Sequence, residues 1–398
     1  MTSRKNPDDL TLDDLFPEGG RILLTGGGRD FVERIGVEAI RDSILSVMMG
    51  DNIRTQTEPL SRRKIAIVSG ALVVLFLRGH LEIGDFTGKL SEMATSQLAK
   101  RGKRDKATTW IAQWLIGLTQ KQFQNVLRSD TEGIKGYIND FEEAIAEAAG
   151  KCEDEFGSVR MELGVIEDPK GRRVRLDWKD IARLTTAIGS QTLAIRGSDK
   201  SMYGKLFERL ILGSFLTILG FERVNPQTNT RSAGVFWLSD SRDLREADAT
   251  LLVQPGRLAR FDIGFIGAGN SEISKDKLSR YAREFELAGG RITSTTFIVV
   301  DRLPKSEKTQ KAAAQIGAEI VQMSLRYWVR DLAQCLGKRM GVTHELQRMR
   351  DDEMENYLKG RLSQIRVQDL LSGVTAEELQ LDEDQNDSAT NDELDDEE

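Results

Sequence analysis

The sequence predicts a mixed α+β or α/β protein, in which a mixed sheet flanked by helices follows an all-helical amino-terminal domain. Three observations predict this fold class. Residues 30–150 carry helical periodicity almost throughout, and residues 191–340 alternate short apolar strands with helices. Within the second region, two apolar strands are joined by the tight turn Gln254-Pro255-Gly256, which predicts an antiparallel pair.

The elements follow in order along the chain. In the first part the periodicity predicts helices over residues 30–49, 65–77, 108–118, 119–128 and 136–149, then short strands over 160–166 and 173–177. In the second part it predicts helices over 203–218, 274–287, 306–316 and 325–336, strands over 221–224, 235–238, 294–300 and 318–323, and helical segments over 343–370.

Composition limits the class of protein. The chain has 398 residues, 30% charged and 39% hydrophobic, enough for two domains or for one large domain with additions. Its only cysteines are Cys152 and Cys335, and its only histidines are His80 and His344. The scarcity of these residues argues against a Cys/His zinc site, and it predicts that the protein works in the reducing cytoplasm. The most apolar run, Ile65–Leu77, is shorter than the roughly 20 residues of a membrane span, so we expect a core helix and no membrane partner.

The carboxyl terminus is strongly acidic. Residues 381–398 contain ten acidic side chains and no basic one, and without them the net charge of −7 becomes +3 for residues 1–380. The segment has no apolar periodicity, which predicts a disordered tail. Such a tail either keeps the protein in solution or competes with a polyanion for a basic surface.

The most informative stretch is EADATLLVQPGRLARFDIGFIG, which carries one carboxylate on each strand of the antiparallel pair. Asp248 lies early in the first strand, and Asp262 lies in the centre of the second. An antiparallel hairpin lets both carboxylates converge on one point, and carboxylate oxygens are the ligands that a hard cation such as Mg²⁺ prefers. Metal-assisted phosphodiester cleavage requires such an arrangement.

This pattern resembles the PD-(D/E)xK nuclease superfamily, in which an Asp and a second acid two residues before a Lys bind Mg²⁺ from adjacent strands. The resemblance implies a nuclease core with Asp248 and Asp262 as metal ligands. A helical Glu commonly reaches the same metal. Glu208, in the apolar run YGKLFERLIL, matches it because a carboxylate there is costly unless it serves a partner. The alternative is an ion pair of Glu208 with Arg209 or Lys205 on a solvated edge.

The chain departs from this motif at Gly264, which stands where the superfamily has the Lys that stabilises the attacking hydroxide and the pentavalent phosphate. A substitute can come from the next helix, in SEISKDKLSRY, with Lys277 preferred over Lys275. Glu272 can add a carboxylate to the same site. The alternative is that these three residues are ordinary surface charges.

More of the chain resembles the CfrBI-type restriction endonucleases. The similarity lies in RFDIGFIGAGNSEISKDKLSRY and the preceding EADATLLV, and in SRRKIAIVSGAL and GLTQKQFQNVL, and it extends over roughly residues 30–340. It implies a type II restriction endonuclease that makes Mg²⁺-dependent double-strand cuts at a short palindrome and leaves 5′-phosphate ends. It also implies a target of the CCWWGG kind and a homodimer or higher homo-oligomer.

Two other functions stay open at this point. The loop Gly264–Asn270 reads like the dinucleotide loop of an NAD(P)-binding oxidoreductase. Against it, Glu272 stands where close helix packing needs Gly or Ala, and Asp262 is unusual in a buried parallel strand. The missing Lys at Gly264 also fits a non-catalytic, sequence-specific DNA-binding regulator in which the carboxylates are structural.

A helix-turn-helix is predicted where Ile116-Gly117-Leu118 leads into the helix over residues 119–128. Thr119 and Gln122 have the spacing of a capping box at its start. The polar side chains of this helix suit bases in the major groove, unless they are the polar face of a bundle helix. They are Gln120, Lys121, Gln124, Asn125 and Arg128.

Two further groups are expected to contact DNA. Lys103 and Arg104, with Lys100, Arg101 and Lys106, suit phosphates, although a solvated basic loop is the alternative. Arg231, with Asn225, Gln227 and Asn229, forms a polar loop that is expected to approach a groove.

These expectations divide the chain into six segments. They are a flexible amino terminus over 1–20, a helical DNA-reading domain over 21–155, a connecting hairpin segment over 156–190, a nuclease core over 191–340, carboxy-terminal helices over 341–380 and the disordered acidic tail over 381–398.

Overall fold

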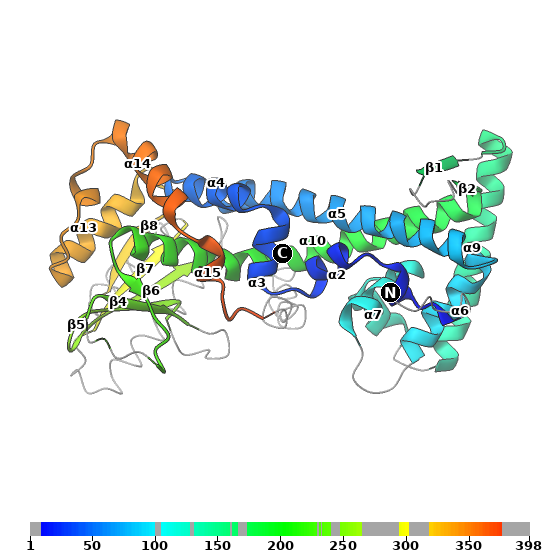
Figure 1. The fold of residues 1–398 in the computed structure, drawn as a ribbon, viewed down its shortest axis with the longest axis horizontal. Helices are drawn as coiled ribbons and strands as arrows, with labels where there is room; N and C mark the ends of the chain where they lie inside the picture. The colour runs from blue at the N-terminus through cyan, green and yellow to red at the C-terminus, as the bar shows by residue number, and fades with distance from the viewer. Residues whose placement is uncertain are drawn as a thin grey trace, which may run out of the picture. The chain divides into compact units, whose positions relative to one another are not determined.

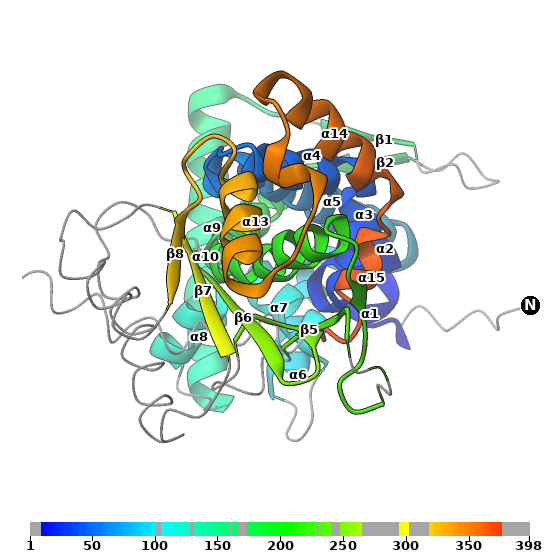
Figure 2. The same cartoon turned by 90° about the vertical axis from the view of Figure 1, so that its left-hand side faces the viewer.

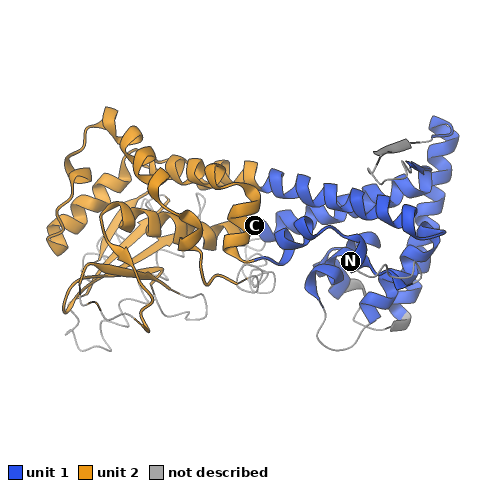
Figure 3. Cartoon of the chain, in the orientation of Figure 1, with its two compact units in different colours: residues 1–26, 61–200, 380–398 blue, residues 27–60, 201–379 orange. Residues whose placement is uncertain are grey.

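The computed structural model (Figure 1) describes residues 9–99, 105–127, 131–159, 161–165, 173–228, 231, 233–239, 247–264, 294–301 and 318–375. The chain forms two compact units (Figure 3). The first, here called the helical unit, consists of residues 1–26, 61–200 and 380–398. The second, here called the sheet unit, consists of residues 27–60 and 201–379.

The helical unit is built from helices and one small two-stranded sheet. It contains α1 (Leu12–Leu15), α2 (Glu18–Thr25), most of α5 (Ile53–Glu82), α6 (Phe86–Ala99), α7 (Lys106–Leu115), α8 (Gln120–Leu127), α9 (Thr131–Phe156) and the first part of α10 (Trp178–Ile218). The strands β1 (Met161–Val165) and β2 (Arg173–Leu176) pair antiparallel, as the sequence predicts.

The apolar run Ile65–Leu77 lies inside α5, where Val68, Leu72 and Leu75 are fully buried. Among the described residues, α5 is the one helix long and apolar enough to cross a membrane, with a mean hydropathy of 1.7 over its most apolar window. Of that window, 39% is buried inside the structure. The core helix of a globular domain meets the same criteria, so this finding is weak evidence for a membrane span.

Two segments near the amino terminus differ from their prediction. The helix expected over residues 30–49 is divided into α3 (Gly28–Ile35) and α4 (Val37–Met48) at Gly36, whose φ of 113° lies outside the helical range. Within residues 1–20, which were expected to be flexible, α1 and the start of α2 are formed. Burial of Leu12 and Leu15 stabilises α1 although the surrounding sequence is polar.

The helix α10 begins at Trp178, whereas the sequence predicts a start at Tyr203. The earlier start is capped by two aspartates: the N–H of Asp180 donates to Asp177 Oδ1 at 2.9 Å, and the N–H of Asp177 donates to Asp180 Oδ2 at 3.3 Å. The segment expected to connect the domains over residues 156–190 therefore includes the first turns of this helix.

The sheet unit contains a six-stranded mixed sheet (Figure 2). Its strands lie side by side in sequence order: β3 (Glu222–Arg223), β4 (Val235–Leu238), β5 (Ala249–Gln254), β6 (Arg257–Gly264), β7 (Ser294–Val300) and β8 (Glu319–Gln322). The strands β4, β5 and β6 are antiparallel to one another in turn, while β3 pairs parallel to β4, and β6, β7 and β8 run parallel. The predicted mixed sheet with a β5–β6 hairpin is confirmed.

One face of this sheet packs against α10. A Cβ at Gly213 of α10 would lie 3.3 Å from the side chain of Leu238, so the glycine permits a close approach. Through the strand register, Leu238 shares its face with Phe261 and Phe297, whose rings stack with centroids 5.2 Å apart. Because side chains alternate along a strand, the opposite face carries Thr250, Arg260, Asp262 and Thr296.

Helices from both ends of the chain complete the sheet unit. They are α3, α4, α13 (Trp328–Met340), the 3₁₀ helix η2 (Glu345–Arg348), α14 (Asp351–Gln364) and α15 (Val367–Leu370). The indole N–H of Trp328 donates to the carbonyl of Val47 at 2.9 Å, and the ring of Phe31 meets Tyr203 edge-on at 5.7 Å. Residues 27–60 are thus part of the unit that contains the sheet.

The capping aspartate of α10 generates a prediction about pH. Burial raises the pKa of Asp180, but His80, at 3.4 Å from its carboxylate, and a hydrogen bond from Thr87 lower that pKa to about 2. Because the pKa is lower in the folded protein, the ionised Asp180 stabilises the fold at pH values above the unfolded pKa of 3.8. This stabilisation is lost as the pH falls towards 2. Asp180→Asn should therefore lower the free energy of unfolding at pH 7 by about 2 kcal/mol.

Urea unfolding of wild type and Asp180→Asn at pH 7, 4 and 3 measures this effect. The difference between the two proteins should shrink below pH 4. A difference that is the same at all three pH values would contradict the ionic role of Asp180.

Candidate active site

The structure brings Asp248 and Asp262 together. The β5–β6 register pairs Ala249 with Phe261, so extending it by one residue places Asp248 opposite Asp262. The carboxylate of Asp248 turns towards β6, where its Oδ2 accepts the N–H of Ile263 at 2.7 Å. Asp262 is 1% exposed. The two acids that the sequence singled out therefore lie at neighbouring positions of adjacent strands.

Asp248 directly precedes β5 and is also held from the side of β4. The N–H of Ser239, one residue beyond β4, donates to the carbonyl of Asp248 at 3.2 Å, and Nη1 of Arg209 donates to the carbonyl of Ser239. Arg209 belongs to α10, and Glu208 is its neighbour on the same helical turn. This chain of contacts places the turn of α10 that carries the half-buried Glu208 beside the strand end that carries Asp248.

A further buried acid follows β7. Asp301 is 8% exposed, and its N–H donates to the carbonyl of Gly264, the last residue of β6, at 3.3 Å. Asp301 is not among the site residues predicted from the sequence. The signal for it is an acid directly after the apolar strand STTFIVV, at the same sheet edge as the end of β6.

The carboxylate pair fits a divalent cation. Burying an ionised carboxylate such as Asp262 is costly unless a positive charge or a metal compensates it. Carboxylate oxygens are the ligands that Mg²⁺ and similar hard cations prefer. Among the residues that the structure describes, no group of three or more His, Cys, Asp or Glu side chains is arranged to hold a metal ion. A pair of carboxylates by itself offers two ligands to such a cation.

Several predicted segments lie outside the described residues: the loop over 265–270, the helices over 274–287 and 306–316, and the tail over 381–398. Several predicted site residues lie outside them as well. These site residues are Glu272, Lys275, Lys277, Lys100, Arg101, Lys103, Arg104, Arg128 and Asn229.

A turn and a capped helix are formed where the helix-turn-helix was predicted. Gly117 has a φ of 75° in the turn between α7 and α8. The capping box is confirmed, since the N–H of Thr119 donates to Gln122 Oε1 at 2.9 Å and the N–H of Gln122 donates to Thr119 Oγ1 at 3.3 Å. Lys121 and Gln124 are exposed.

One predicted base-reading residue is engaged inside the protein. The side-chain oxygen of Gln120 accepts the indole N–H of Trp110 at 3.0 Å, which ties the start of α8 to α7. The side-chain oxygen of Gln120 is therefore used for a contact inside the protein, whereas a contact with bases stays a prediction. The side chain of Asn125 lies outside the described residues, although its backbone is part of α8.

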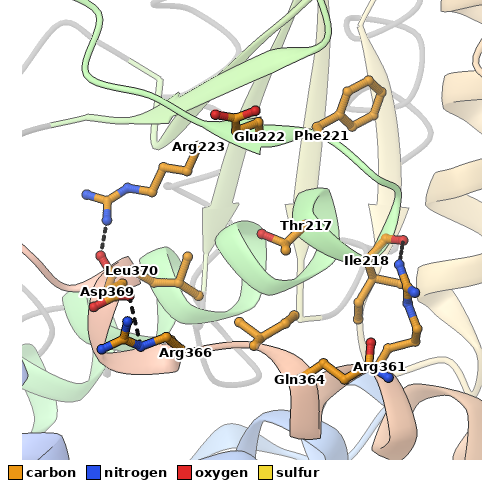
Figure 4. A pocket seen from close by; sticks show the side chains of 11 residues that line it. Thr217, Ile218, Phe221, Glu222, Arg223, Arg361, Gln364, Arg366, Asp369 and Leu370 are labelled. Carbon is orange, nitrogen blue, oxygen red and sulfur yellow. Dashed lines mark hydrogen bonds and ion pairs between the residues drawn. The ribbon is translucent and has the colours of Figure 1, made fainter.

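Arg231 is exposed and forms an ion pair with Glu222 of β3. Glu222 also lines a cavity of about 450 Å³ (Figure 4) between β3, the end of α10 and the segment from α14 to α15. Arg223 lies on one side of it and donates to the carbonyl of Asp369 (Figure 4). Arg223 also donates to the carbonyl and to Oγ of Ser372. None of the predicted site residues lines this cavity. The hydrogen bond from Arg223 to Asp369 connects β3 to α15.

Comparisons with known proteins agree with the sequence resemblance. The family model for the CfrBI restriction endonuclease matches residues 37–308, more than half of the chain. The chain is similar to the type II restriction enzyme CfrBI of Citrobacter freundii, with 32% identity over 363 residues that cover 91% of this chain and 96% of that protein. No solved structure matches the chain. The matched range contains α7, α8 and the β5–β6 hairpin with Asp248 and Asp262.

The contacts of Arg223 generate a prediction about stability. Arg223→Ala removes three hydrogen bonds from a charged donor and should lower the free energy of unfolding by about 2 kcal/mol. Arg231→Ala is the matched control, because its ion pair is exposed and should contribute less than about 1 kcal/mol. Denaturant unfolding measures both, and equal effects would contradict the role given to Arg223.

Proposed function

The chain belongs to the CfrBI restriction endonuclease family, and we propose that it cuts duplex DNA at a short palindromic site by Mg²⁺-dependent hydrolysis, leaving 5′-phosphate and 3′-hydroxyl ends. Family membership makes it a type II site-specific deoxyribonuclease rather than an NAD(P)-binding oxidoreductase or a non-catalytic regulator. The observation that carries the mechanism is the pairing of Asp248 with Asp262 across β5 and β6.

In this mechanism Asp248 and Asp262 would hold the cation, and Glu208 would be a third ligand or a helper from α10. A bound Mg²⁺ would supply a water molecule of lowered pKa and positive charge beside the phosphate. The hydrogen bond from Ile263 keeps the carboxylate of Asp248 directed at β6. Glu272 and one of Lys277 and Lys275 are proposed to complete the site.

The fold of this site is proposed to be a PD-(D/E)xK core. Support comes from the order of elements: the helix α10, the antiparallel strands β4, β5 and β6, and then β7 parallel to β6. The two acids stand just before the second antiparallel strand and within the third, as in that superfamily. Gly264 is the departure from its motif.

DNA reading is assigned to the region of residues 21–155 that contains α7 and α8. The exposed Lys121 and Gln124 of α8, with Asn125 and Arg128, are proposed to face the major groove. Lys103 and Arg104 are proposed to contact phosphates, and Arg231 to approach a groove. A palindromic target requires two identical readers, so we propose a homodimer that acts in the cytoplasm.

The direct experiment is a cleavage assay on unmethylated phage DNA that contains CCWWGG sequences, with Mg²⁺ and with EDTA. Discrete fragments that form with Mg²⁺ and are absent with EDTA support the proposal, and sequencing their ends identifies the target. Intact DNA over a range of salt, enzyme and Mn²⁺ concentrations would contradict it.

Asp248→Ala and Asp262→Ala should each slow cleavage by at least about 100-fold, because each removes a proposed metal ligand. Binding to the target, measured with Ca²⁺ in place of Mg²⁺, should persist. Asp154→Asn, an exposed acid of α9, is the matched control and should cleave like wild type. Full cleavage by either alanine variant would refute the site.

The double variant Gln124→Ala plus Asn125→Ala should relax the choice of target while metal binding is retained, since each lost base contact removes about 1–3 kcal/mol of discrimination. Cleavage rates on the target and on single-base variants of it measure this. Lys151→Ala, exposed on α9, is the control. Unchanged discrimination by the double variant would mean that α8 does not read bases.

A further inference from the structure

The strand that carries Asp262 also carries an arginine on the same face. Side chains two residues apart on a strand point to the same side, so Arg260, Asp262 and Gly264 of β6 share one face of the sheet. Gly264 has no side chain to offer. Arg260 is thus a cationic side chain on the same strand and the same face as the buried carboxylate.

The neighbours of Arg260 are known from the strand register. On one side it pairs with Thr250 of β5 and on the other with Thr296 of β7. Both threonines are buried, at 8% and 9% exposure, whereas Arg260 is half-buried. Two buried neighbours confine the stem of the arginine, and the side chain as a whole stays partly exposed.

The spacing places the arginine at the same distance from Asp262 as the missing lysine would have. Residues i and i+2 of a strand are about 6.7 Å apart, so position 260 is as far from Asp262 as position 264 is, in the opposite direction along β6. A long side chain from position 260 can therefore reach the group that Asp262 holds. The opposite face of β6 carries Phe261 and Ile263, which are both fully buried, so this strand has no cationic side chain near Asp262 on that face.

We propose that Arg260 is a further catalytic residue of this nuclease, whose guanidinium binds the scissile phosphate and supplies a cation in addition to the lysine proposed from the segment after β6. This proposal rests on the proposed function of Asp248 and Asp262. A planar guanidinium donates two parallel hydrogen bonds to phosphate oxygens, so it orients the group as well as neutralising it.

The reaction assigned to this site is a hydrolysis. The oxygen of water bonds to phosphorus, and the bond between phosphorus and the 3′ oxygen breaks. The 3′ oxygen takes up a proton, and the phosphate stays on the 5′ end. The guanidinium of Arg260 interacts most strongly with the phosphate in the transition state, when the non-bridging oxygens carry extra negative charge. An interaction that is stronger in the transition state than in the bound substrate lowers the activation free energy of cleavage.

The test compares Arg260→Ala, Arg260→Gln and Arg260→Lys in single-turnover cleavage at saturating enzyme and Mg²⁺, with DNA binding measured in Ca²⁺. Arg257→Ala is the matched control, because Arg257 is an exposed arginine at the other end of β6, whose Nη2 donates to the carbonyl of Arg339. The alanine and glutamine variants should cleave about 100-fold more slowly or worse, with binding unchanged. Arg260→Lys should cleave at least about tenfold faster than Arg260→Ala, because the lysine keeps the positive charge. Arg257→Ala should cleave at the wild-type rate.

Cleavage by Arg260→Gln within about threefold of wild type would overturn the proposal, as would a loss of DNA binding as large as the loss of rate. The glutamine variant decides the matter if the alanine variant fails to fold. Asp262→Asn is measured alongside. If Asp262→Asn cleaves normally, the proposed metal site itself is wrong. If Asp262→Asn is inactive while Arg260→Gln is active, only the role of Arg260 fails.

Discussion

The antiparallel register of β5 and β6 is the constraint on which the candidate site depends. It places Asp248 opposite Asp262 and aims the N–H of Ile263 at the carboxylate of Asp248, 2.7 Å away. A slip by one residue would turn Asp262 to the face occupied by Phe261, against α10. The tight turn at Gly256, with a φ of 75°, joins the two strands, and the burial of Phe261, which stacks on Phe297 of β7, fixes which face of β6 is turned to the core.

Local patterns in the sequence predicted the parts of the structure that depend on near neighbours. The β5–β6 hairpin, the capping box of α8 and the bounds of β7 follow from turn residues, capping spacing and an apolar run. The early start of α10 and the break at Gly36 were missed. The first depends on two aspartates that cap each other, and the second on the backbone angle of one glycine in an otherwise helical pattern.

Other features depend on residues far apart in sequence, and these could not be predicted. Lys64 and Asp199 form a buried ion pair at 2.8 Å in the helical unit, where an unpaired charge of either sign would be strongly destabilising. Trp328 donates to Val47 and so brings residues 27–60 into the sheet unit. The role proposed for Arg260 likewise needs the strand register, because sequence alone does not say that Thr250 and Thr296 flank it.

Asp248 and Asp262 are proposed to hold the cation used for cleavage. The most direct measurement is a crystal structure with Mn²⁺ and its anomalous difference map. We expect a peak within about 2.0–2.6 Å of carboxylate oxygens from both Asp248 and Asp262. A metal peak elsewhere, with neither carboxylate in contact, would contradict the proposed site.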